Sequence, residues 1–381
     1  METKPQPLII IKSVAGTMGH SSTGRFHRPI YRRNYLFAGF YMIRSRYLRL
    51  AGILLTSVLL AGAGACGSSG GGQIAFVSEA DGDQEIVLLD AETGEATPLT
   101  DNLSQDFGPR WSPDGKTLAY LSDQAGNIDI HLADPREETI TRLTHSDDDD
   151  KSPLWSPDGT RLAFISDRDG NAEVYLMESD GSTQTRITSN DTLEKLGDWS
   201  PDGIWLVFSR SGDDSKEGLW LRNPDGVNLV HLTKGQDSAP VWSPNGRDIA
   251  FVRTDGQNAD IYVVSKLKDG TWQESTELTR LTQLEAADFA PVWSPDSKTL
   301  AFVSFRHENA EIYTMQSDGS KQRRLTNNGA DDLAPVWSPN GKQIAFVSYL
   351  YGEGEIFVMD ADGGRQRRLT NNEADDHSPD W

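Results

Sequence analysis

The residues with the clearest chemical potential are seven carboxylates that recur at one position of a repeated pattern. Each stands five residues before a tryptophan: Asp106, Asp150, Glu194, Asp237, Asp288, Asp332 and Asp376. Gathered in one place, they would attract cations or a basic peptide through their summed negative potential, and their oxygens would suit Ca²⁺. Alternatively, each carboxylate accepts hydrogen bonds from backbone N–H groups of its own connecting loop. A feature present in every repeat is normally architectural, so the structural interpretation is favoured.

Other signals for catalysis are weak. The histidines of the repeated region are scattered and show no His-x-His or HExxH metal spacing: His131, His145, His231, His307 and His377. The same region has no Gly-x-Ser-x-Gly nucleophile elbow and no phosphate-binding glycine loop. We therefore predict no catalytic residue, no metal ligand and no cofactor, with Ca²⁺ at the carboxylates as the one alternative left open.

The marker tryptophans that follow the carboxylates set the repeat length. They are separated by steps of 44, 44, 43, 51, 44 and 44 residues. A period near 44 with several short strands per unit is typical of propeller blades rather than of helical solenoids. Because large aromatic rings bury much apolar area, we expect all seven to pack between blades: Trp111, Trp155, Trp199, Trp242, Trp293, Trp337 and Trp381.

Each unit reads as four short strands. In the unit of Trp155, the turn at residues 156–159 is Ser-Pro-Asp-Gly, in which proline presets φ and glycine supplies a positive φ. β-Forming or alternating residues mark the strands themselves, at 153–155, 161–166, 173–177 and 185–188. No segment of 73–381 has a convincing helical period, so the predicted fold class is all-β.

The number of blades follows from counting the second strand of the unit. It begins at residues 74, 118, 162, 206, 249, 300 and 344. The first copy, 73–100, has no tryptophan strand before it, whereas the last tryptophan strand, 376–381, has nothing after it. Each fragment supplies what the other lacks. We predict a seven-bladed β-propeller over 73–381, closed by pairing of the N- and C-terminal strands, which leaves no open strand edge.

This arrangement places the candidate residues. The seven carboxylates would form an acidic ring at the mouth of the central channel, where the chain enters each innermost strand. The step of 51 residues predicts an inserted hairpin at 266–276, between the third and fourth strands of its blade. Trp272 lies in this insertion, and an exposed Trp272 would be a candidate contact residue.

The charge of the chain restricts its partners. The formal net charge is −21, and residues 1–72 hold nine basic residues and one acidic residue. Residues 73–381 are left with 27 basic and 56 acidic residues, a charge of −29. Such a surface repels nucleic acid and anionic lipid, so nucleic acid is not an expected partner. The charge favours solubility, and a basic partner is the alternative.

The region before the repeats predicts export. Residues 1–41 show no coherent pattern and are interpreted as a mis-called or disordered extension. Residues 42–65 combine three arginines, an apolar run and small residues, as a signal peptide does. The only cysteine, Cys66, follows directly, and Ala63 to Cys66 resembles a bacterial lipobox, in which the cysteine is lipidated. The alternative is an ordinary signal-peptide site with an incidental cysteine. Residues 66–72 are a Gly/Ser linker.

The repeated strings resemble a known family of propellers. Trp-Ser-Pro-Asp-Gly-Lys, Ile-Ala-Phe-x-Ser, Glu-Ile-Tyr-x-Met-x-x-Asp-Gly and Arg-Leu-Thr are similar to the repeats of TolB, the periplasmic component of the Tol–Pal system. Related repeats occur in tricorn and prolyl-oligopeptidase-type proteases. TolB itself has six blades after an α/β domain, whereas this sequence predicts seven blades after a linker. We therefore transfer the fold and no partner-binding residues.

The resemblance and the residues together give the expected function. We predict a non-catalytic, lipid-anchored scaffold that is periplasmic or on the cell surface, is tethered through Cys66 and is monomeric. It would hold a protein or cell-envelope ligand on one propeller face. The alternatives are a carbohydrate-active lyase or hydrolase with its site at the channel mouth, and a protease relative that kept only its gating propeller.

Overall fold

The computed structural model describes residues 72–80, 82–213, 215–256, 258–275 and 277–381. These residues fold into strands and turns, as the four-strand pattern of each repeat predicts. Within the described part of the chain, no helix is long and apolar enough to cross a membrane. The predicted extension, signal peptide and lipidation site lie outside the described residues, and so does the linker apart from Gly72.

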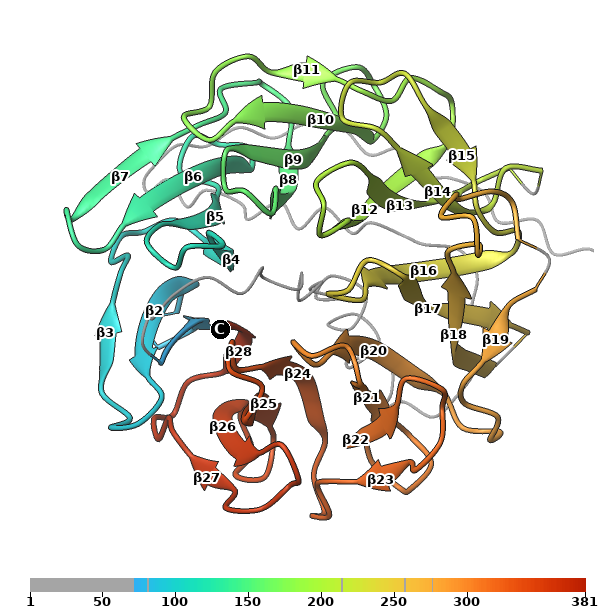
Figure 1. Cartoon of the computed structure of the whole chain (residues 1–381). Coiled ribbons are helices and arrows are strands. Elements are labelled where there is room, and N and C mark those ends of the chain that lie inside the picture. The colour runs from blue at the N-terminus through green and yellow to red at the C-terminus, as the bar shows by residue number, and fades with distance from the viewer. Residues whose placement is uncertain (1–71, 81, 214, 257, 276) are drawn as a thin grey trace, which may run out of the picture. The chain divides into compact units, whose positions relative to one another are not determined.

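Seven four-stranded antiparallel sheets surround a common axis (Figure 1), which confirms the predicted seven-bladed propeller. We number the blades along the chain from the one that contains β1. From the innermost to the outermost strand they are: blade 1, β28 Asp376–Asp380, β1 Gln73–Ser78, β2 Glu85–Asp90 and β3 Ala96–Pro98; blade 2, β4 Asp106–Trp111, β5 Leu118–Ser122, β6 Asp129–Asp134 and β7 Thr139–Arg142; blade 3, β8 Asp150–Trp155, β9 Arg161–Ser166, β10 Glu173–Glu178 and β11 Thr185–Arg186; blade 4, β12 Leu193–Trp199, β13 Leu206–Ser211, β14 Gly218–Arg222 and β15 Leu229–His231; blade 5, β16 Gln236–Trp242, β17 Asp248–Asp255, β18 Asn258–Ser265 and β19 Thr279–Arg280; blade 6, β20 Asp288–Trp293, β21 Thr299–Ser304, β22 Glu311–Gln316 and β23 Arg323–Arg324; blade 7, β24 Asp332–Trp337, β25 Gln343–Ser348, β26 Glu355–Asp360 and β27 Arg367–Arg368.

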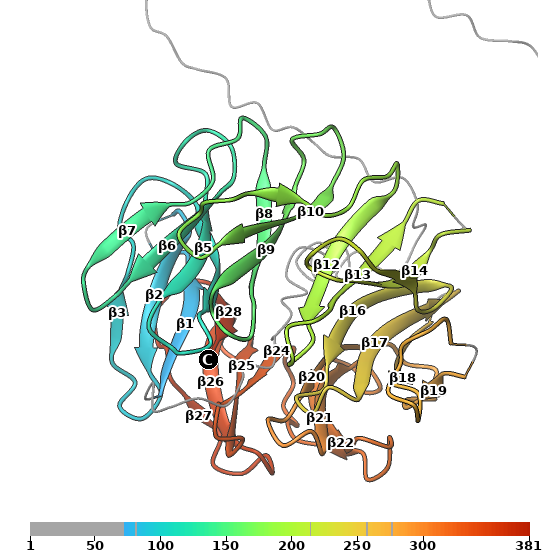
Figure 2. The same ribbon diagram turned by 45° about the horizontal axis from the view of Figure 1, so that its top comes forward.

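The two ends of the repeated region complete blade 1. Strand β28 pairs with β1 in antiparallel register, with Val77 opposite His377 and Ser78 opposite Asp376. Figure 2 shows β28 beside β1. The predicted closure of the ring is therefore confirmed. It gives β1 a hydrogen-bonded neighbour on both sides and removes the open edge that would otherwise face solvent.

A β-bulge bends the innermost strand of most blades. The residue three before the marker tryptophan has a positive φ in six blades, for example 50° at Ala334, and a proline follows it. Blade 4 departs from this pattern and has Gly197 in place of the proline. A Cβ atom built on Gly197 would lie 2.5 Å from Pro240 and 2.6 Å from the carbonyl oxygen of Val207. Blade 4 therefore has no room for a side chain at that position.

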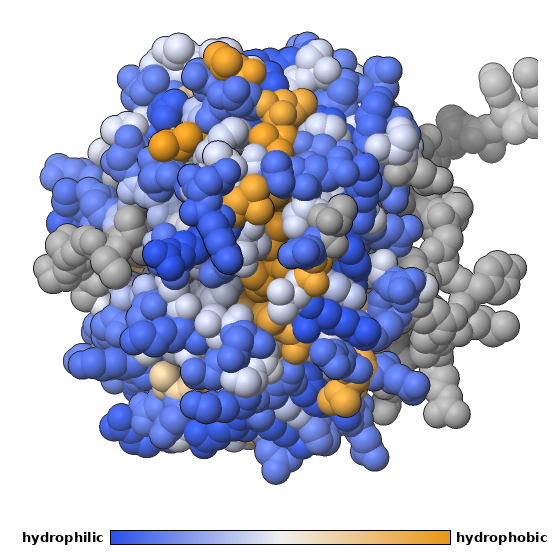
Figure 3. All heavy atoms as spheres, turned by 45° about the vertical axis from the view of Figure 1, so that its right-hand side comes forward, coloured by the Kyte–Doolittle hydropathy of each residue, from blue (hydrophilic) through white to orange (hydrophobic). Residues whose placement is uncertain are grey.

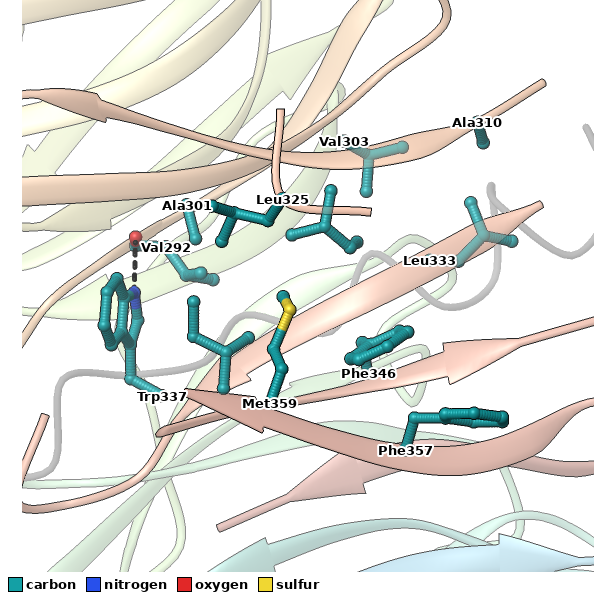
Figure 4. Packing of buried hydrophobic residues seen from close by; sticks show 12 residues of the cluster. Val292, Ala301, Val303, Ala310, Leu325, Leu333, Trp337, Phe346, Phe357 and Met359 are labelled. Carbon is teal, nitrogen blue, oxygen red and sulfur yellow. Dashed lines mark hydrogen bonds between the residues drawn. The ribbon is translucent and has the colours of Figure 1, made fainter. Parts of the chain in front are cut away.

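The hydrophobic cores lie between neighbouring blades. Figure 4 shows one of them, where Trp337 of blade 7 packs with Val292 and Ala301 of blade 6. The indole Nε1–H of Trp337 donates to the carbonyl oxygen of Val292 at 3.3 Å. Trp155, for example, makes the equivalent bond to the blade before its own, at 3.1 Å. Each such tryptophan thus both fills the space between two blades and links their innermost strands.

The insertion lies where the sequence places it, between β18 and β19 of blade 5. Its backbone turns at Leu267, whose N–H donates to the carbonyl oxygen of Thr271 at 3.0 Å. Trp272 is buried and meets the ring of Trp242 edge-on, with the ring centroids 5.0 Å apart. Trp272 is therefore part of the packing and is not available as the exposed contact that the sequence left open.

Candidate functional site

The seven carboxylates lie where the innermost strands begin. Five are the first residue of their strand, and Glu194 and Asp237 are the second. All seven side chains are buried, so they cannot present their charge to solvent at an open channel mouth. The connections from the fourth strand to the next first strand, and from the second to the third, lie at this same end of the propeller. We call this end the carboxylate face.

The carboxylates are held by side chains rather than by the backbone of their loops. The predicted hydrogen bonds from backbone N–H groups of the loops are therefore not made to these seven residues. In three blades that role belongs to the carboxylate one position earlier, which accepts the N–H of the residue just before the third strand: Asp149 from Ile128 at 3.0 Å, Asp331 from Ala310 at 2.8 Å, and Asp375 from Gly354 at 2.9 Å.

In blades 3 to 6 an arginine of the chain itself pairs with the buried carboxylate. In blades 3 and 6 the arginine comes two residues after the second strand, and in blades 4 and 5 it belongs to that strand. The four ion pairs join Arg168 to Asp150 at 2.9 Å, Arg210 to Glu194 at 2.5 Å, Arg253 to Asp237 at 2.7 Å, and Arg306 to Asp288 at 3.1 Å.

Each of these arginines also covers an aromatic ring of the third strand. The guanidinium carbon lies between 4.3 and 5.4 Å from the ring centroid, within the range of a cation–π contact. In blades 3 and 6 the arginine Nε–H additionally donates to the hydroxyl of the last residue of the second strand, Ser166 at 2.7 Å and Ser304 at 2.6 Å. A carboxylate, a serine hydroxyl and an aromatic face thus form a cradle for one guanidinium.

Blades 7, 1 and 2 have the carboxylate without the arginine. These blades are consecutive around the ring, and their carboxylates are Asp332, Asp376 and Asp106. In each, an asparagine amide four residues earlier donates to Oδ2, at 2.6 to 2.9 Å. The other oxygen, Oδ1, is buried and makes no well-aligned hydrogen bond within the described residues. Burial raises the pKa of all three carboxyl groups, that of Asp332 to about 6.

The residues at the arginine position explain this difference. Two residues after the second strand, where blades 3 and 6 have arginine, the three blades have Ala80, Gln124 and Leu350. The serine of the cradle is retained as Ser78, Ser122 and Ser348. In blade 7 the hydroxyl of Ser348 is buried beside the carboxylate of Asp332, and like Oδ1 of Asp332 it makes no well-aligned hydrogen bond among the residues that the structure describes.

A second set of carboxylates stands at or near the start of the third strands. In blade 3, Glu173 pairs with Arg186 of the fourth strand at 2.8 Å, and the backbone N–H of Val174 donates to Thr188 at 2.8 Å. The repeated Arg-Leu-Thr string is therefore a structural network that ties the outer strand to the blade. Blade 1 is the exception. Its acid, Glu85, has no arginine at the matching position of the fourth strand, and burial raises the pKa of Glu85.

Exposed acidic residues surround the three blades without arginine. The six loops of these blades on the carboxylate face are 79–84, 101–105, 123–128, 327–331, 349–354 and 371–375. They contain no Lys or Arg, and their described acids, all exposed or half-buried, are Glu79, Asp83, Asp101, Asp123, Asp331, Glu353, Glu373 and Asp375. We call these six loops the acidic sector. By contrast, the loops 167–172, 212–217 and 305–310 on the same face each contain Lys or Arg.

The acidic sector also exposes apolar side chains. Leu103 is 98 % exposed, Tyr351 is 63 % exposed and Leu350 is 43 % exposed. Figure 3 shows one side of the propeller, on which hydrophilic side chains flank a narrow hydrophobic band. Protein interfaces commonly combine an apolar centre with a polar rim.

Two further carboxylates lie just before the marker tryptophans. Asp380 of blade 1 pairs with Arg110 of blade 2 at 3.0 Å and accepts the backbone N–H of Trp111 at 2.8 Å. Asp198 of blade 4 accepts the backbone N–H of Trp242 at 2.9 Å, and burial raises its pKa to about 7. Both oxygens of Asp198 are occupied by backbone donors, so it is not free to act on a substrate.

Comparison with known proteins identifies the repeats. The sequence model of the TolB beta propeller domain matches residues 66–275 and 219–381. The chain belongs to the TolB beta propeller domain family.

Curated relatives match this TolB-type propeller only over short segments. A Tol-Pal system protein TolB of Thioalkalivibrio sulfidiphilus is 52% identical over 33 residues, which is 9% of this chain and 8% of that protein. The uncharacterized peptidase YuxL of Bacillus subtilis is 29% identical over 91 residues, or 23% of this chain and 13% of that protein. The chain thus matches a small fraction of the length of either relative.

Solved structures share the fold of the TolB-type propeller. An oligogalacturonate lyase in complex with manganese superposes with a TM-score of 0.65 and 19% identity, covering 79% of this chain and 89% of the other. TolB from Acinetobacter baumannii gives a TM-score of 0.51 and 20% identity, covering 81% and 66%. The propeller domain of a protease from Pyrococcus furiosus gives 0.61 and 14%, covering 80% and 96%. At these identities the likeness concerns the fold alone.

The remaining predicted residues of this TolB-type propeller are not brought together. Within the described residues no group of three or more His, Cys, Asp or Glu could hold a metal ion. His131 is buried, and burial lowers its pKa to about 4. His231 stacks on Trp220 with the ring centroids 4.1 Å apart. Cys66 lies outside the described residues. Binding of Ca²⁺ at the carboxylates stays the untested alternative to the prediction of no cofactor.

Sequence reasoning found the carboxylates but missed what distinguishes them. The residue that distinguishes the blades lies two positions after the second strand. It comes close to the carboxylate only when the blade is folded. A signal for it was present, because residues 168 and 306 are arginine whereas residues 80, 124 and 350 are not. Comparing the repeats with one another at that column would have located the acidic sector.

Proposed function

We propose that this chain is a lipid-anchored propeller outside the cytoplasmic membrane that binds a protein or cell-envelope ligand and catalyses no reaction. The observation that carries the proposal is the acidic sector. In a chain built from seven similar units, structural features repeat, and a place that breaks the repetition is a candidate for a specific partner. Membership of the TolB beta propeller domain family supports a binding role, and the sequence of residues 42–66 supports export and anchoring.

The local chemistry supports binding rather than catalysis. In blades 3 to 6 the carboxylates are engaged in ion pairs, and in the acidic sector the free charges are spread over exposed loops rather than focused on one reacting position. Such an arrangement provides long-range attraction and orientation, which raise the rate of association and select against partners of the same charge.

A carbohydrate-active lyase or hydrolase is the second candidate. It is favoured by the likeness in fold to an oligogalacturonate lyase. Electrostatics argue against an acidic polysaccharide as the substrate, because residues 73–381 carry a formal charge of −29 and would repel a polyanion. We therefore rank this candidate below the binding scaffold.

Site-specific photo-crosslinking in intact cells tests the proposal. A photoreactive amino acid at position 103, in the acidic sector, should capture one defined partner. The same amino acid at Val227, which is 75 % exposed on the opposite face, should not capture it. Equal capture at both positions, or no capture together with depolymerisation of a polysaccharide by the purified protein, would contradict the binding role.

A further inference from the structure

We propose that the acidic sector binds a basic polypeptide segment whose arginine side chains enter the empty cradles of blades 7, 1 and 2. This inference rests on the proposed binding role and specifies the chemistry of the partner. The chain itself supplies the template, because four of its blades show how a guanidinium is held at the same position.

The template defines what the ligand must offer. In blade 6 the guanidinium of Arg306 contacts Asp288, donates to Ser304 and lies over the ring of Tyr313 at 4.5 Å. This combination requires a planar cation with several N–H donors, a description that fits arginine better than lysine. A cradle of this composition is therefore selective for a guanidinium group.

Blade 7 keeps the polar part of the cradle without its occupant. Asp332 and Ser348 stand where Asp288 and Ser304 stand in blade 6, and Phe357 replaces the third-strand tyrosine. Oδ1 of Asp332 and the hydroxyl of Ser348 are both buried, and neither makes a well-aligned hydrogen bond among the described residues. Buried polar atoms of this kind are costly to the folded state. An entering guanidinium would satisfy both.

The two neighbouring blades extend the site. Asp376 with Ser78 in blade 1, and Asp106 with Ser122 in blade 2, retain the carboxylate and the hydroxyl, whereas Val87 and His131 stand at the position of the aromatic ring. Each aspartate has a buried Oδ1 that makes no well-aligned hydrogen bond in the described chain. The three cradles are adjacent around the ring. One extended segment with spaced arginines could therefore occupy more than one of them, which favours a polypeptide over a single small cation.

The surroundings match such a segment. The exposed acids of the acidic sector attract positive charge, no Lys or Arg in these loops competes for them, and Leu103 and Tyr351 add exposed apolar area. The empty cradles are covered in the free chain, so the incoming side chain must displace loop residues. The incoming side chain would enter from the loop between the second and third strands, as the side chains of Arg168 and Arg306 do. Ala80 and Gln124, at the matching positions of blades 1 and 2, are exposed.

Filling the cradles from within the chain tests the inference. The triple variant Ala80→Arg, Gln124→Arg, Leu350→Arg places an arginine at the position of Arg168 and Arg306 in each blade. The probe is a fluorescent oligoarginine peptide, with an oligolysine of equal length for comparison. We expect the unmodified protein to bind oligoarginine more tightly, and the triple variant to bind it at least about tenfold more weakly. The melting temperature of the variant should rise, because its buried carboxylates gain partners.

A matched control separates site occupancy from net charge. The variant Ile204→Arg, Val227→Arg, Leu267→Arg adds the same charge at exposed residues of the opposite face. It should retain most of the affinity for oligoarginine. Equal loss in both variants, unchanged binding in the cradle variant, or equal affinity for the two peptides would overturn the inference. If position 103 captured the same partner in cells in both the unmodified protein and the cradle variant, the binding role would stand and only the role of the cradles would fail.

Discussion

Asp198 and Trp242 are joined across a blade boundary, the carboxylate of blade 4 accepting the backbone N–H of the tryptophan in blade 5 at 2.9 Å. The same carboxylate accepts the N–H of Trp199 in its own blade at 2.8 Å. One side chain that is almost inaccessible to solvent therefore links two innermost strands. The residue before it, Gly197, stands where the other blades have proline, and a Cβ atom there would lie 2.5 Å from Pro240 of blade 5.

This link makes stability depend on pH. Burial raises the pKa of Asp198 to about 7 and that of Asp332 to about 6, both above the ordinary 3.8. The folded chain therefore binds protons that the unfolded chain does not, and this contribution to stability is fully present below pH 3.8 and lost as pH rises through about 6 to 7. We expect the free energy of unfolding to increase when pH falls from about 8 to about 5, as measured by urea unfolding.

Replacement of Asp198 by asparagine should flatten this dependence. An amide has one accepting oxygen, so the absolute stability falls, and the slope with pH is the informative quantity. Asp101→Asn, at an exposed loop residue, should leave the slope unchanged. Identical slopes for the Asp198 variant and the unmodified chain would show that this carboxylate does not titrate in the expected range.

The buried ion pair of blade 4 should be costly to break. Arg210 and Glu194 are both buried, and Arg210→Met leaves the carboxylate without its charged partner. We expect a loss of about 3 to 5 kcal/mol in the free energy of unfolding. Adding Glu194→Gln should restore most of it, because no buried charge then remains. The control Arg365→Ala, which breaks an exposed pair with Asp360, should have little measurable effect. Equal losses for Arg210→Met and Arg365→Ala would contradict the prediction.

The indole hydrogen bonds between blades can be isolated by comparing two tryptophans. Trp337→Phe removes the bond to the carbonyl oxygen of Val292, whereas Nε1 of Trp242, which is also buried, has no partner within the described chain. We expect Trp337→Phe to cost about 1 kcal/mol more than Trp242→Phe, because it alone leaves a carbonyl without its donor. Chemical unfolding of both variants measures the difference, and a larger loss for Trp242→Phe would be inconsistent with it.

Ring closure predicts a severe effect of removing one short strand. Deletion of residues 376–381 takes away β28 and exposes the edge of β1. We expect a large fall in melting temperature and self-association through the open edge, visible in thermal unfolding and size-exclusion chromatography. Deletion of an equally short surface segment, such as residues 267–271 of the insertion, serves as the control. A truncated chain that stays monomeric and melts normally would show that blade 1 does not need its last strand.

Membrane attachment depends on Cys66 if the lipobox interpretation is correct. Cys66→Ser should move the protein from the membrane fraction to the soluble exported fraction and abolish incorporation of a labelled fatty acid. Ser68→Ala, two residues away, should change neither readout. A Cys66→Ser protein that remains in the membrane fraction would point to an anchor other than a lipidated cysteine.

The fold could be predicted because its determinants are local and repeated. The Ser-Pro-Asp-Gly turn, the alternation of residues 173–177 and the spacing of the tryptophans each act within a few residues, and seven copies average out the ambiguity of any one. Closure followed from counting strands, since residues 73–100 and 376–381 were each incomplete. The confirmed pairing of β28 with β1 shows that the count was sufficient.

The site could be predicted only in part because its determinants are not local. The arginine that reaches each carboxylate lies 16 residues away in blades 4 and 5 and 18 residues away in blades 3 and 6. Which of the two positions is used depends on the path of the loop. The burial of Trp272 likewise depends on how the insertion folds back onto Trp242, which its own sequence does not specify.

The pairing of β28 with β1 also sets when the molecule can finish folding. β28 is synthesised after every other strand of the ring, so the first blade stays incomplete until residues 376–380 have left the ribosome. A chain threaded through a translocon in an extended state would meet the same requirement on the far side, and would complete its ring only after its last repeat has crossed. Prematurely terminated products would keep an exposed backbone edge, by which proteases and chaperones could distinguish them from finished molecules.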